Sequence, residues 1–444
     1  MTRDNVEPSR KDPSTQNHRV LSIAIPQKPL YDRELFTCSL ERLEKNLAMK
    51  ILLTNHFPLE GSASGLYTWN IAKALANRGL DVTVISPEVS KQNSYQNGFE
   101  VRNIIFKSEE NQDYYDLNFN FPCFTTHPKS DNTFYDLTPT QLEDYLQRFK
   151  KLIRQTIEEK NIKIFHGQHL WVLPYLAFEE GLKGIVTCHG TDLMGYQTDP
   201  RYKKYADKVV QQAKFIVAIS EKTREQIEEL FPNCAEKILT IHNGFESEIF
   251  KPQKITRREI FTKLNLPETD FLISFTGKLA NFKGVDILLE AAKIYEKKIN
   301  ATTVIMGEGD LKGDLINLKN KLELKNVYFL GHQGQQEMAT ITAGADLAVT
   351  PSRKEPYGMV AFEALACETP VVVSDDGWLK EFINEKLGQV FKTEDSSDLA
   401  EKILLEIKTD AKKKKGAYAA KYASKNFSWN SVADRLIDLY KKIG

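Results

Sequence analysis

The sequence has little of several features that mark specialised classes of protein. Only five of its 444 residues are cysteine, and they are scattered along the chain: Cys38, Cys123, Cys188, Cys234 and Cys367. Their odd number and irregular spacing favour neither a disulfide framework nor a cysteine metal site, and a reducing compartment fits best. No apolar run is long enough to cross a bilayer, and the polar N-terminus lacks the apolar core of a signal peptide.

The chain also lacks an excess of charge of either sign. Lysine plus arginine and aspartate plus glutamate both number 60, so no global charge calls for nucleic acid. The hydrophobic content of 41% and the charged content of 27% are ordinary for a soluble globular protein. We therefore expect a cytoplasmic protein whose membrane contact, if it has any, is peripheral and at the inner face of the membrane. The sequence does not indicate its oligomeric state.

A chain of this length exceeds what one hydrophobic core usually serves, and its pattern repeats twice. Short strands rich in valine and isoleucine alternate with amphipathic helices, which predicts largely parallel sheets covered on both faces. The predicted strands of the first half are 50–54, 81–85, 162–166, 184–188, 215–218 and 238–242, and those of the second half are 272–276, 302–306, 327–330, 347–350 and 371–374. Two α/β domains of similar size follow from this pattern.

The expected boundaries divide the chain into three parts. Residues 1–48 read as a polar N-terminal extension that is poorly ordered or partly helical, and Met49 is a candidate for the real start of translation. Residues 49–245 form the first domain, and the amphipathic helix at 429–444 is expected to pack back on it. Residues 246–428 form the second domain.

The most informative segment runs from Glu355 to Cys367. Two glutamates, Glu355 and Glu363, have seven residues between them, and the turn at Gly358 precedes a helix of small residues. Buried strands flank the segment, which makes a βαβ unit whose ligands bind beyond the carboxyl ends of the strands. The free N–H groups at such a helix N-terminus bind anions, while the two carboxylates can accept hydrogen bonds from sugar hydroxyls and from a ribose. The segment therefore predicts a sugar-nucleotide site.

Three further loops of the second domain follow predicted strands. Lys278 and Lys283 lie five residues apart on a loop bounded by glycines, where two point charges can neutralise a diphosphate. Gly307-Glu-Gly309 has the composition of a turn that allows close approach of another group. His332 and Gln333 sit after the next strand and can offer backbone to a nucleotide base. Lysines on loops are usually only solvated, and that alternative stays open.

Two loops of the first domain carry candidate residues. The segment Gly61-Ser62-Ala63-Ser64-Gly65 lies between a strand and a helix, so that its backbone can approach a phosphate or an acceptor closely, although a plain strand-to-helix turn explains it equally well. His189 ends a buried strand and is followed by Gly190, which leaves it open to a substrate. A structural histidine is the alternative there, and Asp192 can fix the same loop by local hydrogen bonds.

The order of these pieces resembles the retaining glycosyltransferases of the GT-B fold, and specifically glycosyltransferase family 4. That family has a small-residue loop after its first strand, a His-Gly-x-Asp loop, and an Asn-Gly linker that leads to a phenylalanine, here Asn243-Gly244 to Phe250. A basic loop, a Gly-x-Gly turn and the two spaced glutamates follow in the same order. The resemblance covers residues 49–444 and implies an α/β protein of two Rossmann-like, doubly wound domains that face a central cleft.

Carried over by position, the resemblance implies a role for each candidate residue. His189, Glu355 and Lys283 would act in catalysis, and Glu363 would bind the ribose. The donor diphosphate would be bound by Lys278, Lys283, Gly358, Met359 and Val360. The phosphate and acceptor loop would be Gly61, Ser62, Ala63, Ser64 and Gly65, and the base region would include His332 and Gln333. Two departures from the family pattern are Lys278 in place of the commoner arginine, and Glu368 in place of a glycine.

The resemblance implies a hexosyl- or N-acetylhexosaminyltransferase that moves a sugar from a nucleotide sugar to a hydroxyl with retained anomeric configuration. A UDP-sugar is favoured, and GDP- and ADP-sugars stay open. The chain has no Asp-x-Asp motif, so no metal or other obligatory cofactor is expected. Alternatives are a sugar-nucleotide-binding subunit that has lost catalysis, a GT-B epimerase and a phosphorylase.

The acceptor is the least determined part of the prediction. Residues 111–148 are rich in aromatic side chains, which can stack on a sugar, hold a lipid, or simply pack an irregular loop. Because no basic and aromatic periodicity accompanies them, a glycan or small soluble acceptor is favoured over a lipid-linked one.

Overall fold

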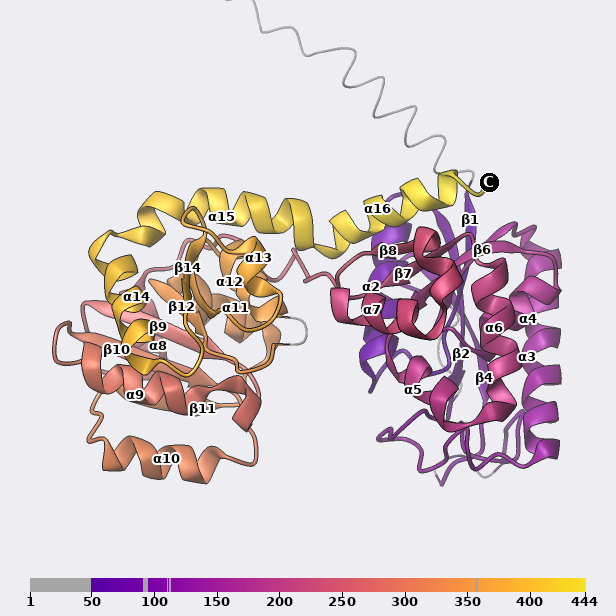
Figure 1. Cartoon of the computed structure of the whole chain (residues 1–444), viewed down its shortest axis with the longest axis horizontal. Coiled ribbons are helices and arrows are strands. Elements are labelled where there is room, and N and C mark those ends of the chain that lie inside the picture. The colour runs from indigo at the N-terminus through magenta and orange to yellow at the C-terminus, as the bar shows by residue number, and fades with distance from the viewer. Residues whose placement is uncertain (1–48, 91–94, 110, 112, 356–357) are drawn as a thin grey trace, which may run out of the picture. The chain divides into compact units, whose positions relative to one another are not determined.

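The computed structural model describes residues 49–90, 95–109, 111, 113–355 and 358–444 (Figure 1). The predicted N-terminal extension, residues 1–48, lies outside the described residues. The described chain contains two β-sheets, each with helices packed on it, as the sequence pattern predicts. The α/β class and the pair of Rossmann-like domains are therefore confirmed.

The first sheet has eight strands in the order β3-β4-β2-β1-β5-β6-β7-β8. All pairs are parallel except β3 with β4. The strands are β1 (Lys50–Thr54), β2 (Asp81–Glu88), β3 (Tyr95–Gln96), β4 (Phe99–Ile105), β5 (Ile164–Gln168), β6 (Lys183–Cys188), β7 (Phe215–Ala218) and β8 (Ile238–Thr240). Their core strands are buried along almost their whole length, because helices cover both faces of a parallel sheet.

The helices of this half are amphipathic or largely apolar and pack on the sheet through two hydrophobic clusters. They are α2 (Ala63–Ala76), α3 (Pro139–Lys160), α4 (Val172–Glu179), α5 (Thr191–Thr198), α6 (Lys203–Gln212) and α7 (Glu221–Leu230), with short 3₁₀ turns at η1 (Pro200–Tyr202) and η2 (Pro232–Lys237). The longest of them, α3, begins at a capping box in which Thr138 and Gln141 satisfy each other's backbone N–H groups.

The second sheet has six parallel strands in the order β11-β10-β9-β12-β13-β14. They are β9 (Phe271–Thr276), β10 (Ala301–Met306), β11 (Val327–Gly331), β12 (Leu347–Thr350), β13 (Val371–Ser374) and β14 (Gly388–Phe391). The helices of this half are α8 (Arg257–Leu264), α9 (Val285–Tyr295), α10 (Lys312–Lys321), α11 (Gln335–Gly344), α12 (Met359–Ala366), α13 (Leu379–Phe382), α14 (Ser396–Lys408) and α15 (Ala411–Phe427), and the turn η3 (Asn281–Lys283) precedes α9.

The last helix, α16 (Trp429–Lys441), packs on α2 and belongs to the hydrophobic core of the first sheet. Ser428 ends α15 and caps α16, since its side chain accepts a hydrogen bond from the N–H of Ser431. Both carboxylate oxygens of Asp434 accept hydrogen bonds from the guanidinium of Arg78 in the first half, at 2.7 and 2.9 Å. The expectation that 429–444 packs back on the first domain agrees with these contacts.

Each sheet has one switch point, at which the order of its strands reverses. The loops beside a switch point are candidates for ligand binding. In the first sheet the reversal lies between β1 and β5, and in the second it lies between β9 and β12. Ligands of doubly wound sheets bind outside the carboxyl ends of the strands at such a point. Lys278 and Lys283 follow β9, and Glu355 and Glu363 follow β12, so the predicted donor residues flank one switch point.

The aromatic segment proves to be mostly core. Phe121, Phe124 and Phe134 are buried against the first sheet, and each ring packs edge-on or tilted on aromatic neighbours. Tyr114 is the exposed member, at 58%. Of the interpretations that the sequence left open, ordinary packing therefore accounts for these phenylalanines.

Candidate functional site

The carboxylate of Glu355 organises the turn that follows β12. Its Oε2 accepts hydrogen bonds from Lys283 Nζ and Ser352 Oγ, both at 2.7 Å, and its Oε1 accepts one from the backbone N–H of Gly358 at 3.0 Å. The side chain is only 3% exposed. A carboxylate has about four acceptor positions, and the described residues occupy three of those on Glu355.

Lys283 and Glu355 thus form a nearly buried ion pair that joins the loops after β9 and β12. The backbone around the lysine fits this role closely. Gly284 has φ +63°, and a Cβ there would lie 1.9 Å from the carbonyl oxygen of Pro351. Only glycine allows the two loops to approach each other to this distance.

The Gly307-Glu-Gly309 turn packs closely against another segment of the protein backbone. A Cβ at Gly307 would lie 1.9 Å from the carbonyl oxygen of Gly277, and one at Gly309 would lie 2.3 Å from that of Leu279. Leu279 also donates its N–H to the carbonyl oxygen of Glu308 at 2.9 Å. The glycines therefore hold the lysine loop in place, and the aliphatic part of Lys283 runs back along Gly277.

At the N-terminus of α12, one of the three N–H groups predicted to be free is already hydrogen-bonded. The N–H of Gly358 points to Glu355, so it is occupied within the turn and is not free for a diphosphate. No side chain caps this helix among the described residues, which leaves the N–H groups of Met359 and Val360 as donors for an anion. This helix contains no acidic residue in its first turn to compete for them.

Glu363 faces a small pocket between the second sheet and α11 and α12. The pocket is lined by Phe250, Ser274, Thr276, Met338, Thr342, Ala348, Val349, Thr350, Val360, Glu363 and Ala364. The carboxylate makes no hydrogen bond to another described residue, and burial raises its pKa to about 7. An unpaired carboxylate in an enclosed pocket is suited to accept hydrogen bonds from hydroxyl groups.

The shifted pKa gives a prediction about stability. Because the pKa of Glu363 is near 7 in the folded protein and near 4.5 in the unfolded chain, the folded state holds the extra proton between these values. Stability should therefore fall as the pH rises through this window, by at most about 3 kcal/mol. We expect Glu363→Gln to raise Tm by several degrees at about pH 8 and by little at about pH 5.

The matched control is Glu323→Gln, since that carboxylate is 83% exposed. Its Tm should follow that of the unmodified protein at both pH values. A gain for Glu363→Gln that is equal at the two pH values would contradict the raised pKa.

The remaining predicted residues of the second domain lie apart from this pocket. Lys278 is exposed beside the Gly277 turn and makes no ion pair with a described residue. His332 is exposed after β11, and Gln333 uses its amide nitrogen to bind the carbonyl oxygen of Leu330 at 2.7 Å. The side chains of Lys278, His332 and Gln333 do not line the Glu363 pocket.

One residue that supports the site was not predicted from the sequence. Arg353 donates to both carboxylate oxygens of Asp286, at 2.9 and 2.6 Å, and to the carbonyl oxygen of Asn281 at 2.7 Å. It also pairs with Glu394. Arg353 thereby ties the turn that carries Glu355 to the start of α9, next to Lys283.

In the first domain, the predicted small-residue loop starts α2. Ser62 caps the helix by accepting a hydrogen bond from the N–H of Gly65 at 3.0 Å, and a Cβ at Gly65 would lie 2.1 Å from the carbonyl oxygen of Pro58. Gly61 has φ +86° and lies against the ring of His127, which also contacts the carbonyl oxygen of Glu60 at 3.2 Å. Ala63 and Ser64 form the first turn of the helix.

His189 lies at the end of β6, where the sequence predicts it, and its ring is held on three sides. Nε2 lies 2.9 Å from Gln168 Oε1, and the rings of Tyr67 and His169 lie at centroid distances of 5.0 and 4.8 Å. Burial, with a smaller contribution from His169, lowers the pKa of His189 well below its ordinary value. The imidazole is therefore neutral at physiological pH.

Asp192 fixes the loop in which His189 lies. Its carboxylate is fully buried and accepts hydrogen bonds from the backbone N–H groups of Leu170 at 2.6 Å and of His189 at 3.2 Å. Burial alone would raise its pKa, but His169 and the N–H of Leu170, with a smaller electrostatic contribution from His189, hold the pKa below its usual value. The local role expected for Asp192 agrees with this geometry.

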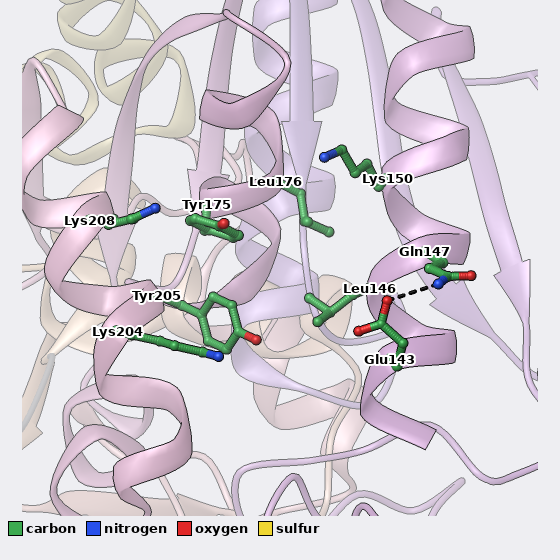
Figure 2. Close-up of a pocket in the computed structure, with 9 residues that line it drawn as sticks. All are labelled: Glu143, Leu146, Gln147, Lys150, Tyr175, Leu176, Lys204, Tyr205 and Lys208. Carbon is green, nitrogen blue, oxygen red and sulfur yellow. Dashed lines mark hydrogen bonds between the residues drawn. The ribbon is translucent and has the colours of Figure 1, made fainter. Parts of the chain in front are cut away.

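A separate pocket lies on the outer helices of the first domain, between α3, α4 and α6 (Figure 2). Leucine, tyrosine and lysine side chains line it, together with Glu143 and Gln147. None of the residues that the sequence singles out for catalysis or donor binding is among them.

Within the described ranges, no helix combines the length and the apolar character that a bilayer span requires. In the same part of the chain, no group of three or more histidine, cysteine, aspartate or glutamate residues is arranged to hold a metal ion.

Comparison with known proteins supports the fold. The model of the family described as Glycosyltransferase Family 4 matches residues 64–248, and that described as Glycosyl transferases group 1 matches residues 256–425. The chain is 26% identical over 311 residues to an uncharacterized glycosyltransferase of Methanocaldococcus jannaschii, which covers 67% of this chain and 81% of the relative. It is 25% identical over 409 residues to the D-inositol 3-phosphate glycosyltransferase of Mycobacterium tuberculosis, covering 87% and 80% respectively.

Solved structures share the fold. HepE of Anabaena, crystallised with UDP and glucose, superposes with a TM-score of 0.61 at 18% identity, covering 89% of this chain and all of that one. At this identity the likeness establishes the two-sheet architecture. It therefore supports the fold, and what the site does must be argued from its residues.

Proposed function

The chain belongs to the glycosyltransferases that these two family models describe and has their GT-B fold, and we propose that it transfers a sugar from a nucleotide-sugar donor to a hydroxyl acceptor with retention of anomeric configuration. The observation that carries the proposal is the junction of the loops after β9 and β12. There Lys283 pairs with Glu355, the N-terminus of α12 has no side-chain cap among the described residues, and Glu363 of the same helix faces its own pocket.

The proposed donor position follows from the charges at this junction. The diphosphate lies against Lys278, Lys283 and the N–H groups of Met359 and Val360, which supply positive charge and hydrogen-bond donors at the switch point. The ribose hydroxyls donate to Glu363 in its pocket. The remaining acceptor position of Glu355 receives a hydroxyl of the transferred sugar.

The chemistry that this arrangement supports is departure of a diphosphate from a sugar. Negative charge grows on the leaving group as the glycosidic bond breaks, and a fixed ammonium and helix N–H groups stabilise that charge without having to reorient. His189 is neutral, so in this proposal its imidazole binds the donor sugar by hydrogen bonding and does not act as a cation. Gly61 to Gly65 border the phosphates and the acceptor.

The donor and the acceptor are proposed as chemical classes. A UDP-hexose or UDP-N-acetylhexosamine is favoured, because the structural neighbour HepE was crystallised with UDP and glucose. The acceptor is a hydroxyl on a glycan or a small polyol, and the name of the mycobacterial relative, a D-inositol 3-phosphate glycosyltransferase, supports the second choice.

Thermal unfolding against nucleotides tests this proposal first. A ligand that binds only the native state raises Tm by mass action, so UDP, GDP, ADP and their sugar conjugates should separate by the size of the shift. We expect one nucleotide class to raise Tm clearly and Glu363→Ala to abolish that shift. No shift with any nucleotide or nucleotide sugar would contradict the proposal and favour a subunit without catalysis.

A further inference from the structure

The backbone and side chain of His169 are both unusual. The residue follows β5, at the switch point of the first sheet, and has φ +72°, a conformation that residues other than glycine rarely adopt. Its side chain is 1% exposed, and neither ring nitrogen has a hydrogen-bond partner among the described residues. Strained backbone and unpaired buried polar groups both destabilise a fold, so they tend to be kept where they serve a function.

The neighbours of His169 show what it supports. Its ring lies 4.8 Å from the ring of His189, and its Nδ1 lies 3.9 Å from the carboxylate of Asp192. The rings of His56, Phe57 and Phe124 enclose its other sides at 6.0, 5.5 and 5.0 Å. Asp192, His169 and His189 thus form a buried series that ends at the partly exposed imidazole predicted to meet the donor sugar.

The residue before it completes the arrangement. Gln168 binds Nε2 of His189 through its amide oxygen, while the N–H of His169 donates to the carbonyl oxygen of Thr187 at 2.7 Å. Gln168 therefore contacts His189 through its side chain, whereas His169, whose backbone is left-handed, contacts Thr187 of β6 through its N–H. The imidazole then packs on one face of the His189 ring, and Tyr67 contacts that ring edge-on.

We infer that His169 is a positioning residue, which packs between Asp192 and the imidazole of His189 and holds that imidazole in its hydrogen bond to Gln168. This inference rests on the proposed function, because it assigns His169 an effect on sugar transfer through His189. If filling space were its only role, a phenylalanine would suit the aromatic surroundings without burying two ring nitrogens that have no hydrogen-bond partner among the described residues. The polar ring is therefore kept for its effect on its neighbours.

The test uses His169→Asn in the full-length protein. Asparagine adopts the left-handed conformation readily, so the backbone is retained while the imidazole is lost. We expect kcat to fall at least about tenfold with KM for the donor changed less than about threefold, and Tm to stay equal or rise. In a His189→Ala background the same substitution should change kcat less than about twofold, because its effect passes through His189.

A second measurement keeps the inference separate from the proposed function. In imidazole ¹H–¹⁵N spectra the ring signals of His189, assigned by their loss in His189→Ala, should move in His169→Asn. An unmodified protein that turns over no nucleotide sugar would contradict the proposed function, and the ring signals would still test the inference. Unmoved His189 signals, or equal losses of kcat in the two backgrounds, would overturn it.

Discussion

Lys283→Ala is expected to lower kcat/KM about 10²–10³-fold, the loss typical when one preorganised donor to a developing negative charge is removed. It should also lower the free energy of unfolding by about 3 kcal/mol, since it leaves the carboxylate of Glu355 buried without its counter-ion. Steady-state kinetics with the donor identified by thermal shift, and thermal unfolding of the same preparation, measure the two effects.

A double variant separates catalysis from stability. In Lys283→Ala with Glu355→Gln, the uncompensated charge is gone, and the glutamine oxygen can still accept from the N–H of Gly358. Stability should therefore recover in large part, while activity should not. Recovery of both would mean that the ion pair only holds the two loops together, and the role of Lys283 in diphosphate binding would be wrong.

The architecture and the order of the site loops could be predicted from the sequence because they depend on local patterns. Runs of buried β-branched residues end where a loop must begin, so the predicted strands 50–54, 215–218, 347–350 and 371–374 agree with β1, β7, β12 and β13. Glycines and charged residues just after those ends then point to the switch points. The predicted carboxylates and lysines lie at one of them for this reason.

His169 shows why the rest could not be predicted. The sequence predicts the strand at 162–166, whereas β5 spans Ile164–Gln168, so the segment that carries His169 begins two residues later than the predicted strand end. The polar residues His166 and Gln168 look like a strand end, yet both are buried, and His166 is satisfied by Tyr440 and Thr187 at 2.8 and 2.7 Å. Tyr440 comes from α16, and although the sequence predicts that this helix packs back on the first domain, it does not show that Tyr440 reaches His166.

Arg353 illustrates a second limit. Its partners Asp286 and Asn281 are about 70 residues away in the chain, and only the parallel pairing of β9 and β12 brings them together. The partners of the glycine turns are likewise distant in the sequence. A sequence shows that Gly307 and Gly309 permit a close approach, but the group that approaches is the backbone of Gly277 and Leu279.

Gly284→Ala should have a large effect on stability for the addition of a single methyl group. The new Cβ would lie 1.9 Å from the carbonyl oxygen of Pro351, which is backbone and cannot turn aside, and alanine is also disfavoured at φ +63°. The two costs together are expected to reach about 3 kcal/mol or more. Because relief requires the loops after β9 and β12 to separate, the Lys283–Glu355 pair and the donor-induced rise in Tm should be lost as well.

Gly313→Ala is the matched control, because it adds the same methyl group to α10 with nothing within 4 Å of the new Cβ. It should stabilise the protein by up to about 1 kcal/mol and leave the donor-induced shift unchanged. Both variants replace glycine by alanine in the same domain, so the comparison isolates the combined effect of the backbone contact and the positive φ at Gly284. A Gly284→Ala protein that unfolds and binds nucleotide like the Gly313→Ala protein would show that the two loops do not meet as described, and the donor site built on their contact would fall with it.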